Sequence, residues 1–463
     1  MMLSISDQDL SLRRRQFLKI GGLGLGGLTL SQLLAVREAA GIGQLHSDRS
    51  VIFLFLHGGP SQTETFDPKP NAPAGIRSAT GDISTSIPGL RFGATFPKLA
   101  SRSHLFSIVR SFQTGDGNHD IKPIVGRDSG GANLGSIYAR VAGTNHPVTG
   151  IPRNVALFPR AVAPDSQPEN NNFGRFTSTG ALGSAYAPFV PGAGGNAQAD
   201  MQLMISRQRL DDRRNLLGEL DRVKQAINGE GLAGDDRLNR QAFETIVGGV
   251  ANAFDLSNEN QKVIESYDTA PLVRPENISR KWRNYNNYVD NAQSLGKLLL
   301  LARRLCESGC GFVTVTTNFV WDMHSDVNNA GVEEGMQYMG LPLDHALSAL
   351  IDDLESRGLR DKVMVVACGE MGRTPKINAR GGRDHWGGLA PLLIYGGGLK
   401  MGQVIGESNA DASRPAADPM NNQNLIATVM HQLMDVGELR TVTGLPEDVM
   451  RAVTAAEPIR GLL

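Results

Sequence analysis

The sequence predicts an α/β fold, a doubly wound and mostly parallel sheet flanked by helices. Apolar residues between Leu343 and Leu354 recur at three- and four-residue spacing, which indicates an amphipathic helix between two strands, a βαβ unit. Runs of apolar residues bounded by turn residues are typical of strands that are buried on both faces of such a sheet. Five such runs occur, within residues 50–61, 104–112, 310–319, 362–370 and 390–398.

The rest of the chain supplies further helices and one long segment of a different character. Apolar stripes from Trp282 to Ala302 and from Leu216 to Ile227 predict two more helices. Residues 151–200 are rich in Pro, Gly, Asn and Ala, and residues 201–270 are charged and helical. Long irregular segments in compact domains are usually functional covers or linkers. We therefore expect residues 41–463 to form one domain, with 151–270 an insertion that covers the sheet edge or the site.

Composition limits the classes of function. The chain has 463 residues, of which 40% are hydrophobic, so it can bury a large core. Lys and Arg number 46 against 47 Asp and Glu, and we find no local basic patch, so charge gives no case for binding nucleic acid. The three cysteines, Cys306, Cys310 and Cys368, form no disulfide framework, and we expect buried free thiols.

The N-terminus resembles an export signal. The basic run from Arg13 to Lys19 is similar to the twin-arginine signal, with Arg13 where Ser or Thr is usual, and an uncharged stretch rich in glycine follows it from Ile20 to Ala35. This stretch is short for a membrane span. We expect residues 1–40 to be removed, the twin-arginine export machinery to be a partner, and the mature protein to be periplasmic or in the cell envelope without a stable transmembrane span.

Histidines and acids gather where the predicted strands end. In open parallel sheets, ligands bind beyond the carboxyl ends of the strands. Imidazoles and carboxylates together suit zinc, manganese or iron, so we predict a site for one or two divalent ions. Taken singly, each histidine is equally typical of an imidazole bonded to a neighbouring carboxylate. The candidate ligands are His57, Glu64, His119, Asp322, His324, Glu370, Asp384 and His385.

Five motifs resemble those of one family. The segments LHGGPSQTETFDPKP, WDMHSD, LPLDHALSALIDDL, GEMGRTP and GRDHWGG are similar, in this order, to the motifs of the DUF1501 family of exported bacterial proteins. That family is grouped with the alkaline phosphatase-like superfamily, which includes sulfatases. The resemblance implies a doubly wound fold with one or two metal ions at the carboxyl ends of the strands, and hydrolysis of sulfate or phosphate esters, including those of polysaccharides.

The resemblance also implies roles for single residues. Asp322 and His324 match the Asp and His that bind metal in the superfamily, and His385 matches its final metal histidine. Asp384 then either orients His385 or binds directly. Glu370 stands where an acid and a histidine are usual, but Met371 replaces that histidine.

The nucleophile and the anion contacts follow from position alone. Thr114 is the best hydroxyl and Asp116 the best acid at the place where the superfamily has its nucleophile. Arg127 and Arg373 are candidates for gripping a tetrahedral oxyanion, although an ordinary ion pair is an equal alternative for each. Two functions remain open, a metal-dependent ester hydrolase and a catalytically degenerate member of the fold that acts in binding or assembly.

Overall fold

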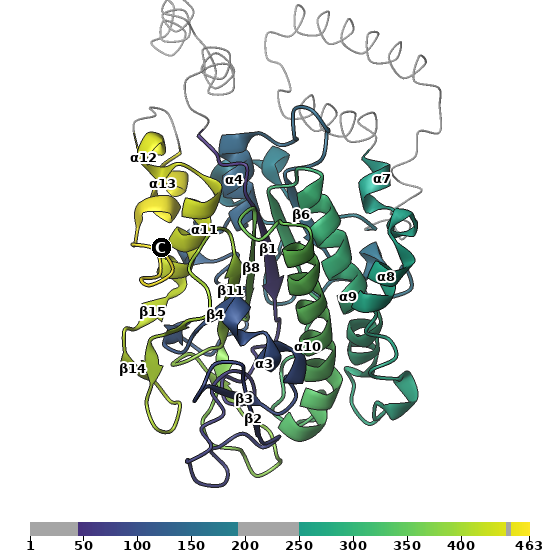
Figure 1. Cartoon of the computed structure of the whole chain (residues 1–463), viewed down its shortest axis with the longest axis vertical. Helices are drawn as coiled ribbons and strands as arrows, with labels where there is room; N and C mark the ends of the chain where they lie inside the picture. Colours follow the sequence, from purple (N-terminus) through teal and green to yellow (C-terminus); the bar gives the residue numbers. More distant parts are fainter. Residues whose placement is uncertain (1–44, 193–249, 441–445) are drawn as a thin grey trace, which may run out of the picture.

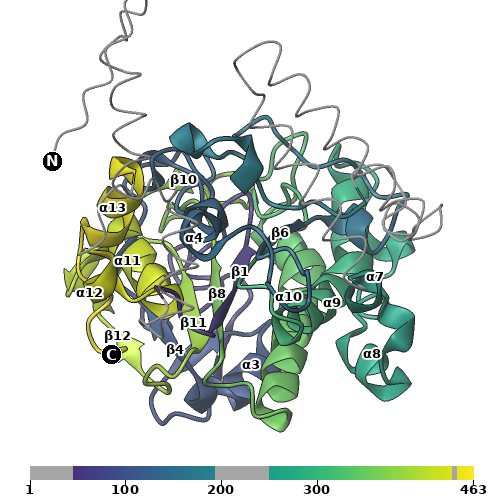
Figure 2. The same ribbon diagram turned by 90° about the horizontal axis from the view of Figure 1, so that it is seen from above.

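The computed structural model describes residues 45–192, 250–440 and 446–463. The export signal predicted at residues 1–40 and the helix predicted around residues 216–227 lie outside the described residues. A seven-stranded sheet runs through the molecule, and helices lie on both of its faces, as the two views in Figure 1 and Figure 2 show. The predicted α/β class with helices on both sides of the sheet is therefore confirmed.

All five predicted strands are in this sheet. In spatial order it consists of β12 (Val404–Ile405), β4 (Phe106–Val109), β11 (Leu392–Gly396), β8 (Val363–Cys368), β1 (Ser50–Phe55), β7 (Phe312–Val315) and β6 (Asn154–Leu157). The two strands that the sequence did not predict, β6 and β12, lie at the two edges. Both are short, at four and two residues, and give too brief an apolar run to stand out.

One strand runs against the others, and this orientation positions the site. β11 is antiparallel to both of its neighbours, β4 and β8, while every other neighbouring pair in the sheet is parallel. A reversed strand begins at the edge where its neighbours end. The residues just before β11 therefore lie at the carboxyl edge of the sheet, beside the loops that follow β1, β7 and β8.

Two helical layers bury the two faces of the sheet. On one face pack α3 (Pro97–Ser101), α7 (Ala251–Phe254), α8 (Gln261–Tyr267), α9 (Tyr285–Glu307) and α10 (Val332–Ser356); on the other lie α4 (Leu134–Ala142), α11 (Asn422–Leu433), α12 (Val436–Leu439) and α13 (Glu447–Thr454). Side chains of β1 alternate between the layers: Ile52 and Leu54 join the α9 and α10 side, and Val51 and Phe53 the other. The stripe predicted at residues 343–354 is the buried face of α10, and the stripe predicted at 282–302 lies mostly on α9, although Trp282 precedes the helix.

Short strand pairs complete the fold. They are β2 (Asp82–Ser84) with β3 (Arg91–Gly93), β5 (Phe112–Gln113) with β15 (Met420–Asn421), β9 (Gly372–Arg373) with β10 (His385–Trp386), and β13 (Glu407–Ser408) with β14 (Pro415–Ala417). The β9–β10 pair matters most for function, because it carries Arg373 and His385 to the carboxyl edge of the sheet.

The structure also shows the state of the three cysteines, a buried acid on α10 and the character of the helices. Cys306, Cys310 and Cys368 are buried free thiols, as expected. Asp344 on α10 is buried, and it accepts hydrogen bonds from the backbone amides of Lys98 and Leu99 in the first turn of α3, at 3.0 and 2.7 Å. None of the helices in the described part of the chain combines the length and the apolar character that a bilayer crossing requires.

The segment 151–270, expected to cover the sheet edge or the site, is described in part. Its first residues form β6, which is itself an edge strand, so this portion belongs to the sheet. Phe173 and Phe176 pack around the ring of His57, at centroid distances of 5.9 and 5.7 Å, so a second portion does lie over the end of β1. Residues 193–249 lie outside the described residues.

We predict that Gly135→Ala loosens α4 from the sheet. A Cβ at this position would lie 2.1 Å from Oδ1 of Asn154 and 2.7 Å from the ring of Phe312. Such overpacking costs about 1–3 kcal/mol, which outweighs the gain of about 1 kcal/mol in helix propensity. Urea unfolding measures the loss. Gly437→Ala in α12, where the nearest atom is a side-chain oxygen of Asp435 at 3.3 Å, is the control and should lower stability much less.

Candidate metal centre

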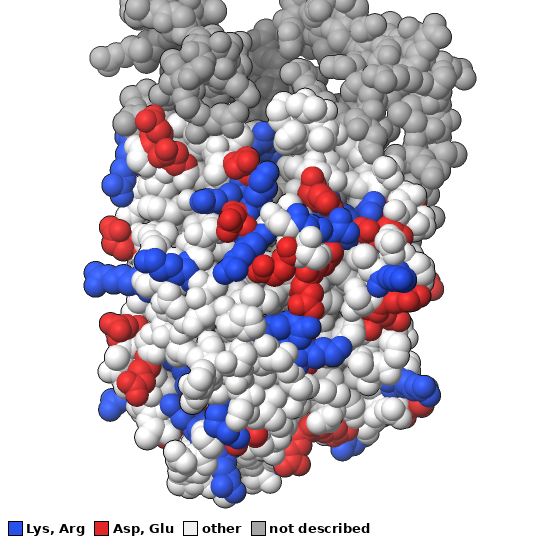
Figure 3. All heavy atoms as spheres, in the orientation of Figure 1, with Lys and Arg blue, Asp and Glu red and all other residues white. Residues whose placement is uncertain are grey.

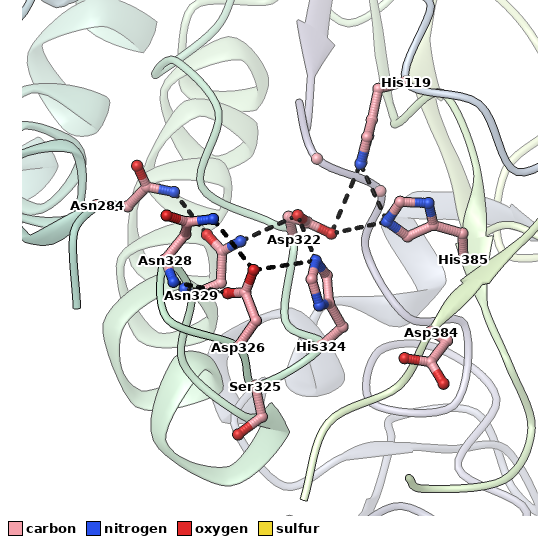
Figure 4. Close-up of polar contacts among 12 residues, drawn as sticks. His119, Asn284, Asp322, His324, Ser325, Asp326, Asn328, Asn329, Asp384 and His385 are labelled. Atoms are coloured by element: carbon pink, nitrogen blue, oxygen red, sulfur yellow. Dashed lines mark hydrogen bonds and ion pairs between the residues drawn. The ribbon is translucent and has the colours of Figure 1, made fainter. Parts of the chain in front are cut away.

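Three side chains from distant segments meet at the carboxyl edge of the sheet. His119 comes from the loop after β5, Asp322 from the loop after β7, and His385 from β10. Nε2 of His119 lies 3.1 Å from Nε2 of His385 and 3.7 Å from Oδ1 of Asp322, and Nε2 of His385 lies 3.2 Å from the same oxygen. Figure 4 shows the two imidazoles and the carboxylate pointing toward one another. We call these three residues the metal cluster.

Glycines bring the loop of His119 onto β10. The backbone amides of Thr114 and Gly115 both donate to the carbonyl of Gly387, at 3.2 Å. A Cβ on Gly387 would lie 2.4 Å from the backbone of Asp116, and a Cβ on Gly117 would lie 3.0 Å from Cβ of His385. The loop and the strand therefore touch backbone to backbone, which places His119 beside His385.

Asp322 is held by three partners. Nη2 of Arg373 donates to its Oδ1 at 2.7 Å, Nδ2 of Asn329 donates to its Oδ2 at 3.0 Å, and Nε2 of His324 lies 2.9 Å from the same Oδ2. Burial favours the neutral acid. The charge of Arg373 and the hydrogen bonds from His324 and His385 outweigh burial and hold the pKa of Asp322 far below its usual range. A charged carboxylate thus remains fixed in a buried position.

His119 offers one nitrogen to the cluster because the other is engaged. Its Nδ1 lies 2.9 Å from Oε1 of Glu370, a fully buried carboxylate that also accepts a hydrogen bond from the backbone amide of Gly58 at 2.9 Å. With Nδ1 donating to Glu370, the Nε2 lone pair faces Asp322 and His385. Burial, with the nearby positive charges, lowers the pKa of His119 to about 3, so the ring is neutral, as a ligand must be.

The spacing of the three donor atoms fits a divalent cation. Ligand atoms around a tetrahedral zinc with bonds of about 2.1 Å lie about 3.4 Å apart. The three separations in the cluster, 3.1, 3.2 and 3.7 Å, bracket this value. Two imidazole nitrogens and one carboxylate oxygen suit zinc or manganese. Within residues 45–192, 250–440 and 446–463, no other group of three such donors comes this close together.

His57, predicted as a ligand, does not join the cluster. Its ring lies among four aromatic side chains, and both ring nitrogens lack a hydrogen-bond partner in the described structure. Burial lowers the pKa of His57 to about 4, so the ring is neutral. Its backbone carbonyl accepts from the amides of Val320 and Trp321, at 3.1 and 3.0 Å. This residue therefore ties the end of β1 to the loop that carries Asp322.

Three other predicted ligands have different partners. Glu64 forms a fully buried ion pair with Arg383 at 2.8 Å and also accepts from Ser78 at 2.7 Å, so its oxygens are occupied. Glu370 orients His119. Asp384 precedes His385 on an extended segment, where successive side chains point to opposite sides, and accepts from Asn378 at 3.0 Å. Figure 4 shows the carboxylate of Asp384 turned away from the cluster.

His324 lies next to the cluster but on the other side of Asp322. It contacts Oδ2, whereas His119 and His385 face Oδ1. The hydrogen bond with Asp322 raises the pKa of His324. Its ring centroid is 5.4 Å from that of His385, so the two rings are neighbours although they contact different oxygens of Asp322.

Three of the four predicted catalytic residues are not aligned with the cluster. Thr114 is buried, and its hydroxyl faces the carbonyl of Asp116 at 3.5 Å. Asp116 is half exposed and pairs with Lys122 at 2.7 Å. Arg127 belongs to the short helix η2 (Arg127–Ser129), which packs against α11 and α13. None of the polar contacts of the cluster involves these residues.

Arg373, predicted to grip an oxyanion, is a structural clamp instead. The side chain is 1% exposed. Besides Asp322, its guanidinium binds the carbonyls of Gly58, Gly59 and Arg383. Four of its five N–H groups therefore have partners within the protein, and it is closed to a substrate.

Sequence reasoning missed the asparagines that support Asp322. Asn284 donates to Oδ1 of Asn329 at 2.6 Å, which leaves Nδ2 of Asn329 to donate to Asp322 (Figure 4). Asn329 is fixed by its own backbone amide, which donates to Asp326 at 2.7 Å in a tight turn. The signal was the pair Asn328 and Asn329, two and three residues after Asp326, but asparagine in a turn is more often a local cap.

The fold and the cluster define an α/β protein with two imidazoles and a carboxylate at the carboxyl edge of its sheet. The chain belongs to the DUF1501 family, whose members are described as proteins of unknown function, because the family model matches residues 48–463. No curated protein matches it. The resemblance stated from the five motifs is therefore confirmed at the level of the family.

Solved structures give a distant likeness. The chain is similar to a sulfatase from Pseudoalteromonas sp., with 10% identity over 87% of this chain and 70% of that one and a TM-score of 0.34. It is similar to a lipoteichoic acid synthase of Listeria monocytogenes, with 9% identity over 88% and 76% and a TM-score of 0.32. A phosphonate monoester hydrolase of Agrobacterium radiobacter gives 12% identity over 84% and 74% and a TM-score of 0.28.

We predict that Gly387→Ala separates His119 from its two partners. The added methyl group meets the backbone of Asp116, so the loop that carries His119 has to move. Zinc affinity, measured by competition with a chelator, should fall by about tenfold or more, as it does when ligand positioning is lost. Gly437→Ala is again the control, and an unchanged affinity in Gly387→Ala would contradict this assembly of the cluster.

A second prediction distinguishes the role of Glu370, next to the metal cluster, from that of Glu64, in an ion pair with Arg383. Burial raises the pKa of Glu370 to about 7. Glu370→Gln replaces the carboxyl group that lies 2.9 Å from Nδ1 of His119, and zinc affinity should fall about 10–100-fold. Glu64→Gln weakens the ion pair with Arg383 and should lower the free energy of unfolding, because a buried arginine loses its charged partner, while zinc affinity per folded molecule stays unchanged. If Glu64→Gln lost zinc as strongly as Glu370→Gln, Glu64 would be a ligand after all.

Proposed function

We propose that the protein is an exported, metal-dependent hydrolase of sulfate or phosphate esters, and that His119, Asp322 and His385 hold its divalent cation. Zinc or manganese is the cation that the donor set favours. The observation that carries this proposal is the convergence of three suitable donor atoms, 3.1–3.7 Å apart, at the edge of the sheet where α/β proteins bind ligands. The motif resemblance to a superfamily of ester hydrolases supports the same class of reaction.

The residues of the chain have distinct tasks in this proposal. When bound, a divalent cation supplies Lewis acidity toward an ester oxygen and neutralises charge that develops on the oxyanion. His119 is neutral and oriented by Glu370, and Asp322 is kept charged by Arg373. His385 is the most open member of the cluster, with its side chain 36% exposed, so the ester approaches from its side.

Aromatic side chains close the opposite side. Phe173 and Phe319 lie against His119, with ring centroids 4.9 and 4.6 Å away, and against each other at 4.7 Å. This apolar wall limits water around the buried half of the cluster, which strengthens electrostatic interactions there.

A second function has a specific observation in its favour. The hydroxyl of Thr114 and the guanidinium of Arg373, the groups expected to attack and to grip the ester, both bind protein atoms instead. A member of the fold that keeps a metal ion but does not turn over substrate would have this arrangement. Its role would be binding or assembly in the cell envelope. Turnover separates this function from the hydrolase.

The test combines metal content with turnover. We expect the purified protein to carry close to one equivalent of zinc or manganese by mass spectrometry and to hydrolyse p-nitrophenyl sulfate or p-nitrophenyl phosphate. His385→Ala should lose the metal and reduce turnover by more than about 100-fold, because a ligand itself is removed. His104→Ala, a histidine bonded to Ser86 away from the cluster, is the control. Absence of turnover on either ester, with or without bound metal, would favour the binding protein, and absence of bound metal would refute the metal-dependent hydrolase.

A further inference from the structure

A cavity lies on the helical face of the molecule, away from the metal cluster. It is lined by residues of α8, α10 and the end of α3, and its volume is about 420 Å³. None of its lining residues belongs to the metal centre. Figure 3 shows the face that carries α10, where positive and negative side chains are interspersed.

The acidic residues of the cavity already have basic partners. Asp352 binds Arg102 through two hydrogen bonds, at 2.7 and 2.6 Å. Asp353 accepts from Arg303 at 2.8 Å and from Arg357 at 2.7 Å. These carboxylates are neutralised within the protein and do not compensate any other charge in the cavity.

Two ammonium groups in the cavity have no carboxylate partner in the described structure. Lys98 and Lys262 are both exposed, and neither forms an ion pair there. Nζ of Lys98 contacts Nδ1 of His345. Burial and the charge of Lys98 lower the pKa of His345, so this ring accepts from Lys98 and adds no charge of its own. The ammonium keeps donors that are free for a ligand.

A buried hydroxyl faces the same cavity without a partner. Ser348 is 2% exposed, and its Oγ has no hydrogen-bond partner among the described residues. It lies one turn after His345 and one turn before Asp352 on α10, so these side chains share one face of the helix. Buried hydroxyls are almost always hydrogen-bonded, and an orphan that lines the same cavity as two lysines without a carboxylate partner indicates a missing acceptor.

We propose that this cavity binds a small organic phosphate, with a dianionic head group and a short apolar body. Two ammonium groups, from Lys98 and Lys262, match the two negative charges of the head, and Ser348 donates a hydrogen bond to it. Val263 and Ala349 line the cavity and contact the apolar body. The site is separate from the metal centre, so the proposal does not depend on the hydrolase activity.

Calorimetric titration with phenylphosphonate tests the proposal. This probe carries the head group and an apolar ring but no ester bond to hydrolyse, and it is compared with inorganic phosphate. Titrations use the full chain and its His385→Ala variant, so that any binding at the metal centre is identified. Lys98→Ala, Lys262→Ala and Ser348→Ala should each weaken binding of phenylphosphonate in both backgrounds by at least about fivefold. Lys281→Ala, which removes an exposed lysine paired with Glu334, is the matched control and should bind as the parent does.

Each other outcome overturns a defined part of the proposal. Binding that is unchanged in the Lys98→Ala and Lys262→Ala double variant, or that is lost with His385→Ala, would place the anion elsewhere. Absence of binding to the parent protein would exclude the site. Equal affinity for inorganic phosphate and phenylphosphonate would exclude the apolar body, and full affinity in Ser348→Ala would exclude the hydroxyl as a contact. Lys98→Arg and Lys262→Arg, which keep the charge, should retain binding if the cations act as proposed.

Discussion

The buried ion pair between Arg373 and Asp322 is the interaction on which the centre depends. Asp322 has to be charged to bind a cation, and burial alone would make it neutral. Arg373 supplies the compensating charge at 2.7 Å and also binds the carbonyls at the end of β1. The same guanidinium therefore fixes the carboxylate, the turn after β1 and the β9–β10 pair in one arrangement. This role in folding explains why Arg373 is closed to an external anion.

The reversed direction of β11 is the second constraint. In a fully parallel sheet, residues before a strand lie at the edge opposite to the residues after its neighbours. Because β11 is antiparallel to β4 and β8, His385 arrives at the edge where the loop after β7 presents Asp322. Glycines at 117 and 387 then allow the loop of His119 to close on it. Topology brings the three ligands to one edge, and glycine contacts set their final spacing.

Features that depend on the apolar pattern could be predicted from the sequence. The roles of single side chains could not, because they depend on interaction partners that are distant in the sequence. Five buried strands and two long helices followed from apolar periodicity, and His119, Asp322 and His385 followed from position at the strand ends. Glu64 is also an acid that follows a predicted strand, as Asp322 is. Its carboxylate is neutralised by Arg383, which is 319 residues away in the sequence. His57 and Glu370 were predicted as ligands, but His57 lies among aromatic rings and Glu370 contacts Nδ1 of His119. Their roles depend on which way each side chain points, and only the tertiary structure gives that direction.

A crystal structure of the zinc- or manganese-loaded protein, with anomalous scattering data collected at the metal edge, tests the central claim most directly. The account predicts one anomalous peak bonded to Nε2 of His119, Nε2 of His385 and Oδ1 of Asp322, with Arg373 still bound to Asp322 and Glu370 still bound to Nδ1 of His119. A peak bonded to Glu64 or Asp384, or no peak between the two imidazoles, would contradict it.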